Sequence, residues 1–356
     1  DASSPRVKWD VGHASMWGEC AALQAQLFMH TDGDEAAADR LAAGAVSDIL
    51  RLVGQVNETK TADFFTSPSL MLAFATLKRA GVLSAAVEAA VRAYATKTFK
   101  PAVPVDSNNQ HYQRAVGLGL AARAFPDASQ ANAWQKYAED VWALVDALGD
   151  ITEDAPNYNR IDLTYLWVLA DTLGKTELLR APSFHAMFAR FGAQVSPSGV
   201  LPSYGDSGAS QKLSAHNFSN APWSNPWGGF VAGFLRAASE GQEPDLADMA
   251  SLMFASGVSS QPLGGEYGDV SEMFRLALAI DWPKRQPSQS MAPAPYHTRV
   301  DLGSAVLTRP DSNGVGRFDK VVLRSNRSGT GGAFLLSDLF ASEVPVPPHA
   351  HENQHG

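Results

Sequence analysis

Residues 115–125, AVGLGLAARAF, are apolar on nearly every side of the helix that their spacing predicts. The stretch LTYLWVLADTLG at residues 163–174 has the same character, and WGGFVAGFLRAA at residues 227–238 is a third example. A helix that is apolar all round is buried in a folded protein. These stretches therefore predict helices in the interior of a helical domain, and their small residues would let neighbouring helices approach closely.

Helices of a second kind alternate with the buried ones. Residues 132–148, NAWQKYAEDVWALVDAL, carry charges on one face and apolar residues on the other, as is typical of an outer helix. Helical periodicity extends from about Trp17 to about Asp281. The alternation of inner and outer helices predicts a mainly α fold, an α/α toroid that forms an incomplete barrel of helical hairpins.

The ends of one of these helices are marked in the sequence. In SPSLMLAFATLKRAG, Ser67 is a suitable N-cap and Pro68 is suited to the first helical position. Gly81 closes the same segment and indicates its C-terminal end. We therefore expect this helix to begin directly after Ser67.

The pattern changes after the last predicted helix. A proline-rich segment follows, and then come short β-rich runs separated by the turn sequences DSNGVG and SGTGG. We expect an α/α toroid domain at residues 1–282 and a linker at residues 283–295. Residues 296–356 would form the N-terminal part of an antiparallel β-sandwich domain that continues beyond them.

Composition excludes several classes of protein. With 45% hydrophobic and 18% charged residues among 356, the chain can bury a large core, unlike a disordered chain or a small disulfide scaffold. The 28 basic against 37 acidic residues give a net charge of −9, which argues against nucleic acid and anionic membranes as partners. A local cluster of Arg, His and Asn can still bind a polyanion, because distant charges are screened beyond roughly 8 Å.

Cysteine usage and apolar runs say less about the compartment. Cys20 is the single cysteine, so no disulfide forms within the chain, and no run of about 18 apolar residues encodes a membrane span. The chain begins DASSPRVKWD without an initiating Met. We expect a processed secreted or periplasmic protein, with a shortened chain as the alternative. The oligomeric state is left open.

Polar and aromatic residues gather directly before the predicted inner helices. Inner helices of a toroid all run the same way, so these segments would share one mouth. They are DSNNQHYQR (106–114), EDAPNYNR (153–160), GVLPSYGDSG (199–208), APWSNPWGG (221–229) and GGEYGD (264–269). Helix N-termini favour anions, and a wide polar mouth with aromatic side chains suits a sugar polymer. The expected partner is therefore an anionic polysaccharide.

These motifs resemble those of the polysaccharide lyases of the alginate lyase, chondroitin AC lyase and heparinase II/III type. In that group an NNH-like motif supplies an Asn and a His that neutralise a uronate carboxylate, and a downstream Tyr acts as base, acid or both. NNQHY matches the asparagine pair with Asn108 and Asn109, and His111 follows one residue later than usual, after Gln110. Tyr158 falls where the family tyrosine does. The resemblance implies β-elimination from glucuronan or an alginate-like polymer.

The chemistry agrees with these residue types. Elimination across C4–C5 removes a proton α to a carboxylate, so hydrogen-bond donors or cations must stabilise the developing charge. A tyrosine of pKa about 10 must also be shifted toward the working pH to act as a base. A nearby cation lowers the pKa of an acid by roughly 1–3 units, and Arg160 and His111 are the candidates beside Tyr158. In the resembled enzymes a histidine often follows the catalytic tyrosine directly, and in this sequence Asn159 stands at that position.

The expected site comprises catalytic and substrate-binding residues. The catalytic candidates are Asn109, His111, Tyr158, Arg160 and Tyr204, and the substrate-binding candidates are Asn108, Asn157, Trp223, Trp227, Glu266 and Tyr267. Capping of a helix by the asparagines, and packing of the tyrosines between hairpins, are the structural alternatives. The elimination requires no cofactor. In the resembled enzymes a divalent metal stabilises the β domain, and HAHENQH at residues 349–355 is the candidate site here, with a flexible terminus as the alternative.

Two other functions stay open. A glycoside hydrolase on the same toroid would use two carboxylates, for which the mouth offers Asp154, Asp206, Glu266 and Asp269. A non-catalytic carbohydrate-binding protein is the third reading. The concentration of Asn, His and Tyr favours the lyase, while the uronic acid, its linkage and endo or exo action are left open.

Overall fold

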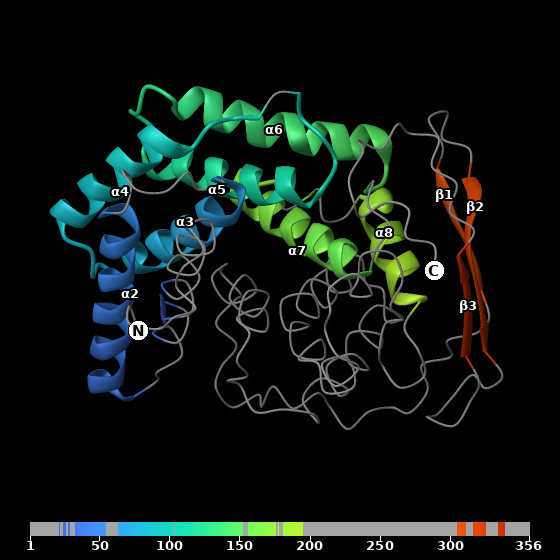
Figure 1. Cartoon of the computed structure of the whole chain (residues 1–356), viewed down its shortest axis with the longest axis horizontal. Coiled ribbons are helices and arrows are strands. Elements are labelled where there is room, and N and C mark those ends of the chain that lie inside the picture. Colours follow the sequence, from blue (N-terminus) through green and yellow to red (C-terminus); the bar gives the residue numbers. More distant parts are fainter. Residues whose placement is uncertain are drawn as a thin grey trace, which may run out of the picture.

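The computed structural model describes residues 21, 24, 25, 28, 33–54, 63–102, 104–151, 156–175, 177, 181–194, 305–310, 316–324 and 334–338. This part of the chain is mainly helical, with one small sheet (Figure 1). Its helices are α2 (Glu35–Gly54), α3 (Asp63–Arg79), α4 (Ala85–Thr98), α5 (Asn109–Ala124), α6 (Ala131–Leu148), α7 (Pro156–Leu173) and α8 (Pro182–Gly192). Its strands are β1 (Ala305–Pro310), β2 (Gly316–Arg324) and β3 (Phe334–Asp338).

Helices α5 and α7 are the buried helices that the sequence predicts. Most residues of α5 are buried, and every residue of α7 from Asp162 to Ala170 is buried. By contrast, α6 buries one face through Trp134 and Val141, while Lys136 and Asp140 form an exposed ion pair of 2.7 Å. The distinction between inner and outer helices is therefore confirmed for these three. The third apolar stretch, residues 227–238, lies outside the described residues.

Helices α3 and α5 run in the same direction, and residues 66–74 of α3 are buried like most of α5. Near their N-terminal ends the Arg114 guanidinium lies over the Phe64 ring, 5.4 Å from its centroid. Near their C-terminal ends the rings of Phe74 and Phe125 are 5.2 Å apart. A Cβ atom added at Gly117 would lie only 2.1 Å from the Ser67 hydroxyl. The absence of a side chain at this glycine therefore allows the close approach of α3 and α5.

Helix α7 is parallel to α5 as well. At their C-terminal ends Arg123 donates hydrogen bonds to the Asp171 and Thr172 carbonyls, at 3.3 and 3.1 Å. At the other end Ser107, just before α5, donates to the carbonyl of Asp150, which precedes α7. Helices α3, α5 and α7 thus present their N-terminal ends on one side.

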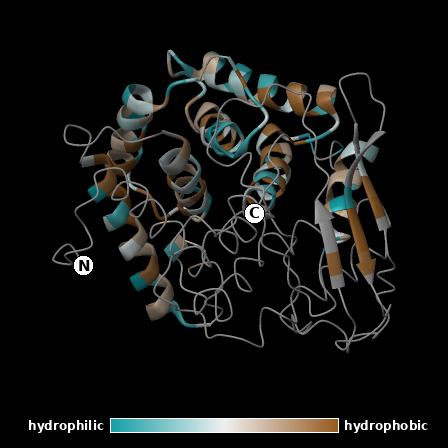
Figure 2. Ribbon diagram, turned by 45° about the vertical axis from the view of Figure 1, so that its right-hand side comes forward, coloured by the Kyte–Doolittle hydropathy of each residue, from teal (hydrophilic) through white to brown (hydrophobic). Residues whose placement is uncertain are grey.

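Helix α2 lies at the edge of the helical part and carries both hydrophilic and hydrophobic residues (Figure 2). None of the helices in the described ranges combines the length and apolarity needed to cross a membrane.

One predicted boundary is wrong. Helix α3 begins at Asp63, so Ser67 is inside the helix and Pro68 is an interior proline. Proline lacks an N–H, and near a helix start it removes only one hydrogen bond from the ladder, so the preceding turn can still form. The predicted end is confirmed, because Gly81 has φ +73° and its N–H donates to the Lys78 carbonyl.

The strands form an antiparallel sheet in the order β1-β2-β3. Ala305 lies opposite Val322, and the register shifts between Leu307 and Thr308. Val322 is fully buried, whereas the next residue along β2, Leu323, is 48% exposed, as alternation in a strand requires. The predicted β-rich runs are therefore strands. The predicted linker, residues 283–295, lies outside the described residues.

A buried carboxyl on α2 makes stability depend on pH. Asp48 accepts a hydrogen bond of 2.6 Å from Gln24. Burial raises the pKa of the Asp48 carboxyl above its usual value, and this effect exceeds the lowering caused by the positive charge of Arg51 and by the Gln24 hydrogen bond. A raised pKa in the folded state means that stability falls as pH rises from below the unfolded pKa to above the folded one. We expect Asp48→Asn to raise the unfolding temperature at about pH 7 and change it little at about pH 3.

Thermal unfolding of both proteins at the two pH values checks this expectation. Asparagine keeps an acceptor oxygen for Gln24, so the substitution removes the charge and little else. A lower unfolding temperature for Asp48→Asn at pH 7 would contradict it.

Candidate functional site

The N-terminal ends of α5 and α7 place two of the predicted motifs at the same height along the axes of these parallel helices. Contacts between these helices pair residues 48 to 53 positions apart, Arg123 with Asp171 and Thr172, and Gly119 with Thr172. By this spacing Tyr158 is level with residues 105–110. The asparagine pair and the predicted catalytic tyrosine therefore occupy the same end of neighbouring parallel helices.

Asn108 is the N-cap of α5. Its Oδ1 atom accepts hydrogen bonds from the amides of Gln110 and His111, at 3.1 and 3.4 Å. Its Nδ2 atom donates to Asp106 at 3.0 Å. Asparagine at this position satisfies N–H groups that the helix itself cannot, which explains locally why α5 begins here. The capping alternative thus describes the contacts of Asn108.

Asn109 lies in the first turn of α5 and is 5% exposed. Its Oδ1 atom accepts a hydrogen bond from Gln113, one turn further along the helix, at 3.4 Å. The side chain is packed within the protein, so a substrate group would have to reach it below the surface. The sequence pattern alone did not predict this burial.

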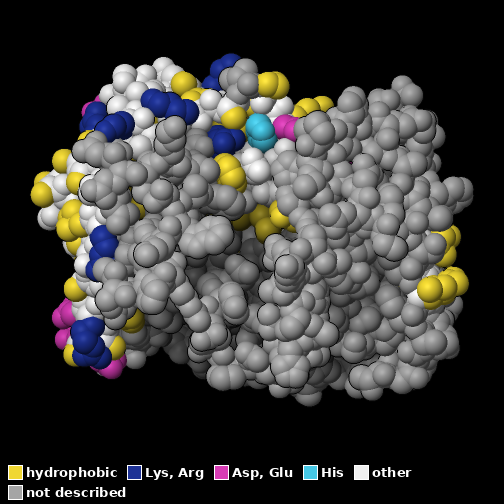
Figure 3. Space-filling model, in the orientation of Figure 1, with side chains coloured by type: hydrophobic (Ala, Val, Ile, Leu, Met, Phe, Trp, Pro, Cys, Tyr) yellow, Lys and Arg dark blue, Asp and Glu magenta, His cyan; other side chains and the backbone are white. Residues whose placement is uncertain are grey.

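His111 is half-buried and contacts two groups through one ring nitrogen. The Asp106 amide donates to Nδ1 at 3.2 Å, and the Tyr137 hydroxyl lies 2.7 Å from the same atom. The two rings are 6.2 Å apart between centroids. Figure 3 shows a histidine at the surface of the helical part, beside an acidic side chain. Tyr137 comes from α6 and was not among the predicted site residues.

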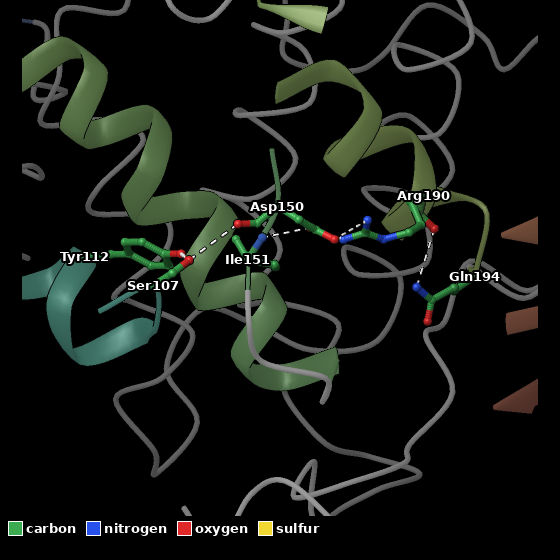
Figure 4. A network of polar contacts seen from close by, with 6 residues as sticks. All are labelled: Ser107, Tyr112, Asp150, Ile151, Arg190 and Gln194. Atoms are coloured by element: carbon green, nitrogen blue, oxygen red, sulfur yellow. Dashed lines mark hydrogen bonds and ion pairs between the residues drawn. The ribbon is translucent and has the colours of Figure 1, made fainter. Parts of the chain in front are cut away.

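A buried polar network supports this end of the helices (Figure 4). Tyr112 and Ser107 share a hydrogen bond of 2.5 Å between their hydroxyls, and the Ser107 hydroxyl also donates to the Asp150 carbonyl at 3.4 Å. The Asp150 carboxylate pairs with both terminal nitrogens of Arg190 on α8, one of them at 2.6 Å. The side chains of Asp150 and Arg190 are only 9% and 11% exposed. The network joins α5, the α6–α7 connection and α8.

Tyr158 is half-buried in the first turn of α7. We expected it in a loop that precedes the helix, but α7 begins at Pro156, because proline is well suited to the first helical position. Asn159 is 2% exposed and belongs to the interior. Asn157 and Arg160 are also in α7, but their side chains lie outside the described part of the structure.

The remaining predicted residues lie outside the described residues. They are the candidates Tyr204, Trp223, Trp227, Glu266 and Tyr267, the carboxylates Asp154, Asp206 and Asp269, and the metal candidate at residues 349–355. The described residues include no group of three His, Cys, Asp or Glu side chains that could hold a metal ion.

The carboxylates described at this end already have partners. Asp106 accepts hydrogen bonds from the Ser107 amide at 2.7 Å and from the Asn108 side chain. Asp150 is paired with Arg190. Both carboxylates therefore hold local structure together, whereas the four carboxylates expected for a hydrolase lie outside the described residues.

The chain was compared with protein-family models, with curated proteins and with solved structures, and it matches nothing in any of the three.

Proposed function

We propose that the chain is a polysaccharide lyase that cleaves a uronate polymer, glucuronan or alginate-like, by β-elimination. One observation carries the proposal: the Asn108–His111 segment and Tyr158 are level at the N-terminal ends of two parallel helices. Helix N-termini on the same side favour an anionic ligand there through their aligned dipoles. In α5 the amides of Gln110 and His111 already donate to Asn108, so the dipoles and the side chains carry this preference.

The residues divide the reaction between them. His111, Arg160 and Asn109 would donate to the substrate carboxylate and stabilise the charge that develops on it. Tyr158, as phenolate, would take the C5 proton; the electron pair of that C–H bond forms the C4–C5 double bond, and the C4–O bond breaks. The departing oxygen then takes a proton from Tyr158 or from Tyr204.

The wider architecture belongs to the same proposal. The parallel row α3, α5 and α7, with α6 as an outer helix, supports an α/α toroid in which the mouth lies at the N-terminal ends of the inner helices. The antiparallel strands β1, β2 and β3 support a β-sandwich domain after it. A polymeric substrate is consistent with a secreted or periplasmic enzyme.

A panel of uronate polymers tests the reaction. We expect glucuronan or alginate to yield chains that end in a 4,5-unsaturated uronate, seen as rising ultraviolet absorbance during incubation. Heat-inactivated protein provides the control.

Two outcomes would contradict the proposal. Reducing ends that appear without ultraviolet absorbance would indicate hydrolysis. Binding of a polymer with neither product would indicate a carbohydrate-binding protein.

A further inference from the structure

The Nδ1 atom of His111 is held by two groups from different parts of the chain. The Asp106 amide precedes α5 and donates to Nδ1 at 3.2 Å, and the Tyr137 hydroxyl of α6 lies 2.7 Å from it. A backbone N–H can only donate, so Nδ1 must present its lone pair. The neutral ring therefore carries its proton on Nε2, and the Tyr137 hydroxyl is the second donor to Nδ1.

We propose that Tyr137 is a positioning residue that, with the Asp106 amide, holds His111 as a neutral imidazole with its proton on Nε2. In a ring held this way, Nε2–H faces away from both donors and is itself a hydrogen-bond donor. His111 can then donate to an anionic group, but it cannot accept a proton at Nε2 without first losing one.

The surroundings of Tyr137 make it a rigid support. The residue is 3% exposed and lies on the buried face of α6, next to Ala138, which is fully buried. Ala138 packs near Gly119 of α5, where an added Cβ would lie 3.4 Å from the alanine Cβ. The close packing of α5 and α6 thus fixes the tyrosine ring, while His111 at its tip is half-buried.

The catalytic meaning of this arrangement rests on the proposed function. If a uronate carboxylate binds at this end of α5, a neutral His111 donor would stabilise the developing charge, and proton removal would fall to tyrosine. Tyr137 would act only through His111, without contact with the substrate. The geometry at His111 can be tested without any substrate.

Nitrogen-15 NMR of the histidine rings in the full chain, at about pH 8, tests the geometry. The chain has nine histidines, and His111→Gln identifies the His111 signals by their loss. We expect an unprotonated, hydrogen-bonded Nδ1 and a protonated Nε2 in the wild type. In Tyr137→Phe the Nδ1 signal should move toward that of a nitrogen without a hydrogen bond. A proton on Nδ1 in the wild type, or an unchanged His111 spectrum in Tyr137→Phe, would overturn the proposal.

Turnover measures the consequence for catalysis. On the polymer that the wild type cleaves, Tyr137→Phe should lower kcat about 10- to 100-fold and change KM little, because a misplaced donor is missed mainly in the transition state. Tyr94→Phe is the matched control, a tyrosine that is 4% exposed on α4, and it should keep its kcat. An equal loss in Tyr94→Phe, or normal kcat in Tyr137→Phe, would overturn the positioning role. If the wild type cleaves no polymer, the proposed function fails, and the NMR result still decides the state of His111.

Discussion

Tyr158→Phe is expected to lower turnover of a uronate polymer by roughly 10²–10⁴-fold, the usual contribution of a general acid or base. The substitution removes only the hydroxyl from a half-buried residue in the first turn of α7. The unfolding temperature should therefore change little while the proton-transferring group is lost. Initial rates of product formation, followed by ultraviolet absorbance across pH, check this, because the rise of the rate with pH that ionisation of the Tyr158 hydroxyl produces should disappear.

Tyr165→Phe is the matched control for this substitution. Tyr165 lies on the same helix and is fully buried, so its hydroxyl is not available to a substrate. That variant should retain its turnover. Equal losses in Tyr158→Phe and Tyr204→Phe would fit separate base and acid tyrosines. Full activity in Tyr158→Phe, with loss only in Tyr204→Phe, would transfer the role to Tyr204.

Asp150→Ala is expected to lower the free energy of unfolding by about 3–5 kcal/mol, the usual cost of removing one partner of a buried ion pair. Asp150 pairs with both terminal guanidinium nitrogens of Arg190, and the two side chains are 9% and 11% exposed. Removal of the Asp150 carboxylate leaves the positively charged Arg190 guanidinium buried without this ion-pair partner, which destabilises the folded state. Denaturant unfolding of both proteins measures the difference.

Two further variants make this result interpretable. Asp150→Ala combined with Arg190→Met should recover part of the loss, because the buried charge is then absent. Asp140→Ala breaks the exposed pair with Lys136, whose side chain is 73% exposed, and should change stability very little. If Asp150→Ala were as mild as Asp140→Ala, the network around Asp150 would not stabilise this end of the helices.

The helices were predictable because their signals are local. The apolar character of residues 115–125 and 163–174 predicts burial, and α5 and α7 are buried. The ends were less predictable. Ser67 and Pro68 together are typical of a helix start, but α3 begins at Asp63, since one missing hydrogen bond does not prevent the preceding turn from forming.

The candidate site was predictable only in part. The sequence marks Asn108 and Tyr158 as polar residues at helix starts, and α5 and α7 do begin beside them. It did not distinguish the half-buried Asn108 from the buried Asn109, because adjacent residues at a helix start point in different directions. That difference depends on which neighbouring helix covers each side chain.

For the part of the chain that the structure describes, the sequence by itself determined that helices precede the strands and that α5 and α7 are buried while α6 exposes one face, because hydropathy repeats along the chain with the period of each element. The tertiary structure alone decided the contacts of the site. His111 meets Tyr137 across 26 positions, and Arg190 meets Asp150 across 40. Such pairs form only when packed helices bring distant segments together, and no local pattern encodes which polar residue will find a partner there. The supporting residues of the site therefore follow from packing, whereas the helices that hold them follow from periodicity.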